Sequence, residues 1–188
     1  MKPKREHSTN NQQTYFLTSL TWERRPFFRH QRWAELFIQV LHHYRETAYF
    51  VHEFVLMPDH FHLIITPKTS LERSIQFLKG GFSYRAKTEL HSNMEVWQRG
   101  FSDHRIRDAA DYAQHVEYIY SNPVRKHLCT TPQEYPYSSA NNKFLFDSAP
   151  QGLKPALAGS IGTAKAVPLQ SDTANTVSLQ SKAAGGFK

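Results

Sequence analysis

Two histidines separated by one residue, His60 and His62, are the residues of this sequence best placed to do chemistry. In a β-strand, residues i and i+2 project from the same face, so the two imidazoles would lie side by side while Phe61 faces the other way. Two neutral imidazoles form an open metal site when a third ligand joins them, and imidazoles alone allow zinc as well as other divalent ions. A purely structural role for the pair stays open, because the chain has 11 histidines.

A second candidate is Tyr118, which helical periodicity separates from two neighbouring tyrosines. At about 100° per residue, Tyr112 and Tyr120 fall on the apolar side of a predicted helix, whereas Tyr118 falls on the polar side with Asn122 one turn later. The Asn122 amide oxygen could complete a two-imidazole metal site and bring the Tyr118 hydroxyl beside the ion. A tyrosine beside a Lewis acid that holds a phosphate is a nucleophile suited to DNA cleavage. An exposed tyrosine–asparagine pair without a role is the alternative.

The histidine pair begins the last of three predicted strands, over residues 14–22, 49–56 and 60–66. The second and third strands are joined by the tight turn at residues 57–59. Both are nearly continuous in apolar residues, which favours central positions in the sheet. A further extended segment is expected within residues 96–106.

Helices are predicted between these strands from apolar residues at three- and four-residue spacing. They cover residues 33–44, Leu71 to Phe82 with a weak point at Gly80-Gly81, and a third segment from the N-cap Asp108 to the residue before Pro123. The order of elements predicts an α+β fold, with a ferredoxin-like antiparallel sheet and helices packed mainly on one face.

The charge of the chain favours a polyanionic partner. It has 23 Lys and Arg against 16 Asp and Glu, a net charge of +7, and its basic clusters alternate with aromatic residues, which is typical of nucleic-acid binding. The single cysteine, Cys129, excludes an internal disulfide framework and fits a reducing compartment. No apolar stretch approaches the roughly 20 residues of a membrane span, so a cytoplasmic protein without a membrane partner is expected.

Composition also divides the chain into parts. Residues 1–13 are polar and predicted to be a flexible N-terminus, and residues 14–146 hold all the predicted elements. Residues 147–188 are rich in Ala, Gly, Ser, Thr, Gln and Lys and show no apolar periodicity, which predicts a disordered, low-complexity tail.

Three motifs in fixed order carry a family resemblance. They are MPDHFH at residues 57–62, VWQRGFSDHRIR at residues 96–107 and YIYSNPVR at residues 118–125. Together they resemble the REP-associated tyrosine transposases, single-tyrosine members of the HUH (His-hydrophobe-His) nuclease superfamily, over residues 14–140. The resemblance implies a transposase domain over residues 14–146. In it, His60 and His62 match the metal-binding pair, Tyr118 matches the nucleophile, and Asn122 matches the residue that helps hold the metal.

The resemblance also implies a reaction. Family members use Mg²⁺ or Mn²⁺, bind palindromic repeats as single-stranded hairpins, and cleave beside them through a 5′-phosphotyrosine bond that leaves a free 3′-hydroxyl. It predicts a metal-dependent single-stranded DNA endonuclease and strand transferase, as a monomer or a homodimer. Two alternatives stay open. A non-catalytic nucleic-acid-binding module gives no reason for the histidine pair and Tyr118 to coexist, and a small metallohydrolase gains little support from a basic surface.

Nine residues are predicted to contact DNA, through stacking on bases or binding of phosphates. They are Lys79, Arg85, Trp97, Arg99, Phe101, His104, Arg105, Arg107 and Arg125. The alternatives are core positions for Trp97 and Phe101, solvated surface positions for Lys79, Arg85 and Arg125, and a local hydrogen-bond pair or a further metal ligand for His104.

Overall fold

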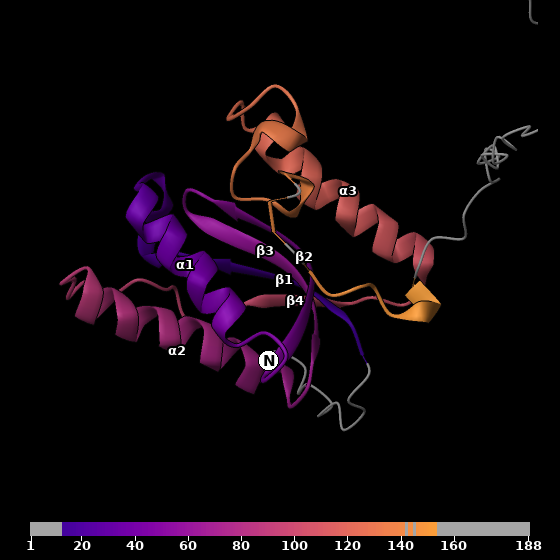
Figure 1. Ribbon diagram of the computed structural model, residues 1–188, viewed down its shortest axis with the longest axis horizontal. Helices are drawn as coiled ribbons and strands as arrows, with labels where there is room; N and C mark the ends of the chain where they lie inside the picture. The colour runs from indigo at the N-terminus through magenta and orange to yellow at the C-terminus, as the bar shows by residue number, and fades with distance from the viewer. Residues whose placement is uncertain (1–12, 142, 145, 154–188) are drawn as a thin grey trace, which may run out of the picture. The chain divides into compact units, whose positions relative to one another are not determined.

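The computed structural model describes residues 13–141, 143–144 and 146–153, and within them four strands form one antiparallel sheet (Figure 1). The strands are β1 (Tyr15–Leu20), β2 (Tyr49–Met57), β3 (His60–Pro67) and β4 (Ser102–Arg105), in the order β2-β3-β1-β4. Helices α1 (Gln31–His43) and α2 (Leu71–Glu89) cover one face of the sheet, and α3 (Ala109–Arg125) covers the other. This confirms the predicted α+β fold, with two of the three helices on one face.

The alternation of side chains along β3 builds a separate core on each face of the sheet. Phe61, Leu63 and Ile65 are fully buried in the core that α1 and α2 complete. Ile64 points the other way and is buried with Ile119 of α3. The same alternation places His60 and His62 on the face that α3 covers.

Helix α2 runs unbroken through the glycine pair that we expected to bend or end it. Gly81 serves a different purpose, because a Cβ added there would lie 2.6 Å from Cε2 of Tyr44, at the end of α1. The missing side chain therefore lets the two helices of this layer approach each other closely.

Helix α3 begins as predicted but ends later than predicted. The side chain of Asp108 caps it by accepting a hydrogen bond from the backbone N–H of Asp111 at 2.9 Å. The expected end before Pro123 is wrong, since the helix continues to Arg125. A proline removes one backbone donor, and in the last turn this loss is small. The carbonyl of Pro123 still accepts a hydrogen bond from the backbone N–H of Leu128.

Of the two strands expected at the centre of the sheet, only β3 has strands on both sides. β2 lies at the edge of the strand order, where the segment that follows α3 covers it. The backbone N–H of Leu56 donates to the carbonyl of Tyr137 at 2.8 Å, and that of Phe54 donates to Ser139 Oγ at 3.0 Å. This cover explains why an edge strand is so apolar.

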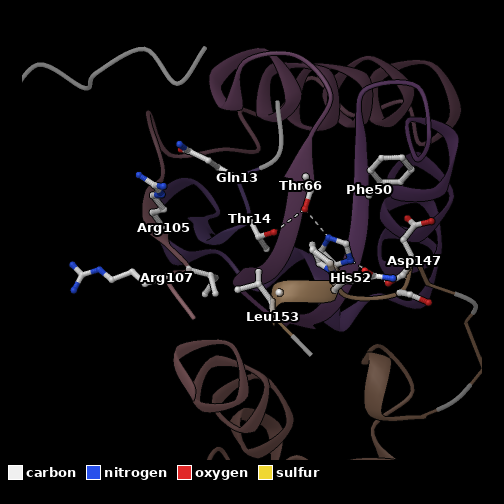
Figure 2. Close-up of a pocket in the computed structure, with 14 residues that line it drawn as sticks. Gln13, Thr14, Phe50, His52, Thr66, Arg105, Arg107, Asp147 and Leu153 are labelled. Carbon is white, nitrogen blue, oxygen red and sulfur yellow. Dashed lines mark hydrogen bonds between the residues drawn. The ribbon is translucent and has the colours of Figure 1, made fainter. Parts of the chain in front are cut away.

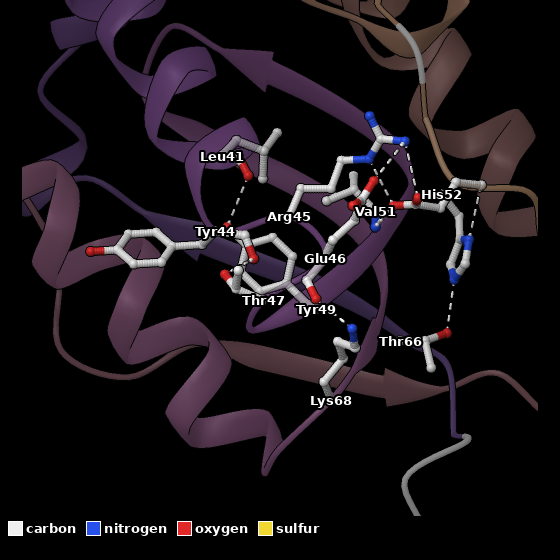
Figure 3. A network of polar contacts seen from close by, with 11 residues as sticks. Leu41, Tyr44, Arg45, Glu46, Thr47, Tyr49, Val51, His52, Thr66 and Lys68 are labelled. Carbon is white, nitrogen blue, oxygen red and sulfur yellow. Dashed lines mark hydrogen bonds and ion pairs between the residues drawn. The ribbon is translucent and has the colours of Figure 1, made fainter.

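The packed region extends beyond the boundary predicted at residue 146. Asp147 accepts hydrogen bonds from Arg45 Nε at 3.0 Å and from the backbone N–H of Val51 at 2.8 Å. Figure 3 labels Arg45 and Val51 in this network of polar contacts. Asp147, the first residue of the predicted tail, therefore contacts the packed domain. Residues 1–12 and 154–188, which make up most of the two predicted terminal segments, lie outside the described residues.

The predicted extended segment at residues 96–106 is a strand only from Ser102 to Arg105, and Trp97 forms an isolated bridge with Thr21. Among the described residues, no helix has the length and apolar character needed to cross a membrane.

Candidate active site

The structure brings Tyr118 against the histidine pair, although the two come from different elements. The rings of His60 and His62, both on β3, have centroids 4.8 Å apart. The ring of Tyr118, from α3, meets that of His62 edge to face with centroids 5.1 Å apart. The Tyr118 side chain is 40% exposed, so a macromolecular substrate can reach it.

Each histidine of the pair is oriented through its Nδ1 atom. The Nδ1 of His60 donates to the Asp59 carboxylate at 2.6 Å, and the Nδ1 of His62 lies 2.7 Å from Thr18 Oγ1 on β1. Burial acts to raise the pKa of Asp59, but hydrogen bonds from His60 and Arg24 outweigh it and hold that pKa below its ordinary value. Because the Nδ1 atoms are engaged, the Nε2 atoms are the ones left to bind a ligand.

The Nε2 atom of His62 fits a metal ion. It is buried and has no hydrogen-bond partner among the described residues, an arrangement that normally costs free energy. Burial, and then the proximity of His60, lower the pKa of His62 to about 3, so its imidazole is neutral at physiological pH and keeps a free lone pair. A neutral imidazole with a free Nε2 lone pair is a suitable ligand for a divalent cation.

Asn122 is not exposed on a polar helix face, as the periodicity suggested, but buried with 6% of its surface accessible. It lies one helical turn after Tyr118 on α3, which packs against β2 and β3 of the sheet. Its assignment as a third metal ligand stays a prediction.

Basic side chains surround Tyr118 and His60. The guanidinium carbon of Arg125 lies 5.9 Å from the centroid of the Tyr118 ring. Next to His60 is an open pocket of about 400 Å³, which is also lined by Arg24, Arg29 and Lys126. These cations can attract and hold the phosphates of a nucleic acid beside the histidine pair.

Three of the other predicted DNA-contacting residues hold the α1–α2 side of the fold together. Trp97 is buried in the core, as in the alternative interpretation, and its indole N–H donates to the Lys79 carbonyl at 3.1 Å. The ammonium group of Lys79 donates to the carbonyls of Gln98 and Gly100 at 2.9 and 2.8 Å. Phe101 is partly buried against the same core.

The remaining predicted DNA contacts are dispersed. Arg85, on α2, pairs with Glu89 and donates to Gln39 of α1, and Arg99 is exposed in the loop before β4. Arg105 and Arg107 border an open pocket of about 960 Å³, with His52 on its other side in Figure 2. The nine residues therefore do not form a single strip, and only Arg125 contacts Tyr118.

His104 is hydrogen-bonded to Asp111, with its Nε2 2.9 Å from Asp111 Oδ2. His115, one turn after Asp111, contacts the same carboxylate at 3.0 Å. These three residues were not predicted to lie together, although the four-residue spacing of Asp111 and His115 puts both on one side of a helix. The contact of Thr18 with His62 was also missed, because nothing local in the sequence indicates that β1 pairs with β3.

Comparison with known proteins gives consistent results. The family model described as "Transposase IS200 like" matches residues 9–122. A REP-associated tyrosine transposase of Escherichia coli K12 is 30% identical over 98 residues, which are 50% of this chain and 56% of that protein. A protein of Haemophilus influenzae, provisionally given the same name, is 32% identical over 96 residues, 45% of this chain and 54% of its own length. The chain thus spans about half the length of these curated relatives.

A solved structure of a REP-associated tyrosine transposase bound to a REP hairpin has the same fold. It superposes with a TM-score of 0.62 and 21% sequence identity, over 85% of this chain and all of the other. The family match covers more than half of the sequence and includes His60, His62 and Tyr118. The chain belongs to the IS200-like transposase family.

Proposed function

We propose that this protein is a metal-dependent enzyme that nicks and rejoins single-stranded DNA beside a palindromic hairpin, with Tyr118 as its nucleophile. One observation carries the proposal: the Tyr118 ring contacts His62, whose buried Nε2 has no hydrogen-bond partner among the described residues. A nucleophilic hydroxyl and a metal ligand beside each other are what a phosphoryl transfer needs. The REP hairpin in the solved structure of similar fold supports the choice of substrate.

In the proposed reaction, the Tyr118 hydroxyl attacks the phosphorus of one phosphodiester. A bond forms between the tyrosine oxygen and phosphorus, the bond from phosphorus to the 3′ oxygen breaks, and the tyrosine proton passes in net to that oxygen. The products are a 5′-phosphotyrosine and a free 3′-hydroxyl. Because the covalent link conserves the phosphodiester, a 3′-hydroxyl can attack it in turn and rejoin the strand without ATP.

The proposed metal ligands are His60, His62 and Asn122, and the proposed ion is Mg²⁺ or Mn²⁺. When bound, such an ion supplies positive charge next to the phosphate oxygens and stabilises the charge that develops there. Asp59 and Thr18 keep the two imidazoles oriented through their Nδ1 atoms. The guanidinium carbon of Arg125 lies 5.9 Å from the centroid of the Tyr118 ring, which supports a proposed role in binding the phosphate next to the one under attack.

The test is covalent capture of labelled DNA. The full chain is incubated with Mn²⁺ and end-labelled single-stranded hairpins taken from inverted repeats that flank the gene, and the products are separated on a denaturing gel. We expect a protein–DNA adduct that EDTA prevents and that Tyr118→Phe lacks. Tyr84→Phe is the matched control, because Tyr84 is 69% exposed on α2, and it should form the adduct normally.

Each competing function predicts a different result. An adduct that persists in Tyr118→Phe would contradict the assigned nucleophile. Hairpin binding that is indifferent to EDTA, with no scission, would indicate a binding module. Scission by Tyr118→Phe without any adduct would indicate a metal-bound water as the nucleophile, as in a metallohydrolase.

A further inference from the structure

A second group of metal-ligating side chains lies between β4 and the first half of α3. His104 comes from β4, and Asp111 and His115 come from two successive turns of α3. One potential ligand atom from each of the three lies within 4.8 Å of the other two. The imidazole rings of His104 and His115 are stacked, with centroids 4.7 Å apart and planes inclined by 17°.

The Asp111 carboxylate is oriented as a ligand would be. Its Oδ2 accepts a hydrogen bond from the backbone N–H of Arg107 at 3.0 Å, which fixes the carboxylate plane. Its Oδ1 lies 3.1 Å from His104 Nε2 and 3.0 Å from His115 Nδ1. A tetrahedral ion with ligand bonds of about 2.0–2.2 Å needs ligand atoms about 3.5 Å apart, so small shifts of these side chains would suffice.

We propose that His104, Asp111 and His115 form a second divalent-metal site that fixes α3 to β4. Two imidazole nitrogens and one carboxylate oxygen are the ligands that Zn²⁺, Co²⁺ and Ni²⁺ prefer over Mg²⁺. In the structure, His115 Nδ1 lies 2.8 Å from the backbone carbonyl of Asp111, which can only accept, so this nitrogen carries a proton. Binding of the ion requires the tautomers in which His104 Nε2 and His115 Nδ1 carry no proton, and it replaces this hydrogen bond. The His104 side chain is 39% exposed and those of Asp111 and His115 are 17% and 19% exposed, so an ion with its water ligands can enter.

The proposed site is connected to the candidate active site through Phe16 of β1. The Phe16 ring contacts that of His115 with centroids 4.6 Å apart, that of His62 at 5.4 Å and that of Tyr118 at 5.8 Å. His115 also precedes Tyr118 by three residues, nearly one turn of the same helix. An ion held by His104, Asp111 and His115 would therefore restrict the movement of the helix segment that carries Tyr118.

The test separates the two sites by measuring ion stoichiometry. The full chain, purified without a polyhistidine tag, is titrated with Co²⁺ and followed by calorimetry and visible absorption. The His60→Ala/His62→Ala variant should still bind one ion, with the absorption of a low-coordinate cobalt site. Adding His104→Gln and His115→Asn should abolish this binding. These amides replace Nε2 and Nδ1 with NH₂ groups that can still donate to Asp111, so the metal-free contacts are kept.

Two further variants complete the design. His43→Gln, at an exposed position of α1, should leave the stoichiometry unchanged. The double variant His104→Gln/His115→Asn, with His60 and His62 kept, should bind one ion fewer than the native chain. It tests the site even if the variant without His60 and His62 fails to fold. Circular dichroism shows whether each variant is folded. The proposal is overturned if Co²⁺ binding does not change in that variant. Because the measurement needs no DNA, its result is independent of the proposed strand cleavage.

Discussion

The hydroxyl oxygen of Thr18 lies 2.7 Å from Nδ1 of His62, on the residue directly opposite in the antiparallel pair of β1 and β3. This contact engages Nδ1, and the other ring nitrogen, Nε2, has no hydrogen-bond partner among the described residues. A residue on a neighbouring strand thus determines which nitrogen of His62 is free to bind a ligand.

Replacement of Thr18 by valine should weaken metal binding. Valine has nearly the same shape as threonine and suits a strand, but it has no hydroxyl group to hydrogen-bond with Nδ1 of His62. We expect the affinity for Mn²⁺ to fall by about 10–100-fold, the usual effect of removing such a partner. Calorimetric titration measures it, and Thr18→Ser, which keeps the hydroxyl, should bind nearly as the native chain does. Equal affinities for all three proteins would show that the contact is unimportant.

Replacement of Arg125 by glutamine should slow formation of the DNA adduct. A charge-assisted hydrogen bond to phosphate contributes about 1.5–3 kcal/mol, which corresponds to about 10–100-fold in rate. The control is Arg73→Gln on α2, where the guanidinium lies over the Phe77 ring at 4.6 Å. The rate at which each variant forms the covalent DNA adduct is measured and compared with the rate of the native chain. A similar decrease in both variants would indicate a general effect of net charge instead of a contact at Tyr118.

Replacement of Asp147 by alanine should destabilise the fold, although this residue lies past the predicted domain end. It would remove the carboxylate to which Arg45 Nε donates and leave the backbone N–H of Val51 without its carboxylate acceptor. We expect a loss of about 1–3 kcal/mol in the free energy of unfolding, measured with urea. Glu117→Ala, at an exposed position of α3, should change it by less than about 0.5 kcal/mol. If Asp147→Ala proves equally harmless, the domain does end near residue 146.

Acidification should destabilise the protein partly through His52, which is buried on β2 beside Asp147 and Thr66 (Figure 2). Burial lowers the pKa of His52 despite the nearby Asp147 carbonyl and charge. The unfolded chain, where this histidine has a pKa of about 6.5, therefore binds more protons below that pH than the folded chain does. Stability should fall as the pH decreases from about 7 to 5. In the His52→Gln variant, whose side chain cannot titrate, the free energy of unfolding measured with urea should decrease less over this pH range. If the variant and the native chain have the same pH profile, His52 is not a cause of the acid destabilisation.

Much of the site could be predicted because the local periodicity of strands and helices determines on which face each of these residues lies. The strand alternation that puts Phe61 in the core also puts His60 and His62 on the opposite face, and the helical period separates the exposed Tyr118 from the buried Tyr112. These rules need no knowledge of which elements pack together.

The rest depends on tertiary packing. Periodicity puts Asn122 on the polar side of α3, and the structure shows that it is buried all the same. The sheet face that α3 covers also carries polar side chains, among them His62 and Thr18. Periodicity indicates which residues share a side of a helix, and it does not indicate whether solvent or protein faces that side. The pairing of β1 with β3 and β4, which joins Thr18 to His62 and Phe16 to His104, is likewise not encoded in any local pattern.

Tyr118 is carried by the middle of α3, a helix anchored by the fully buried Ile119, and not by a loop. When the backbone is fixed, the phenol group of Tyr118 can move only by rotation about its two side-chain torsions. In the proposed chemistry, a 5′ DNA end attached to it would stay within a few ångströms of the imidazoles until resealing. Exchange of strands would then require the incoming 3′ end to travel to a stationary phosphate, so the choice of joining partner would depend on how the DNA itself is folded and delivered.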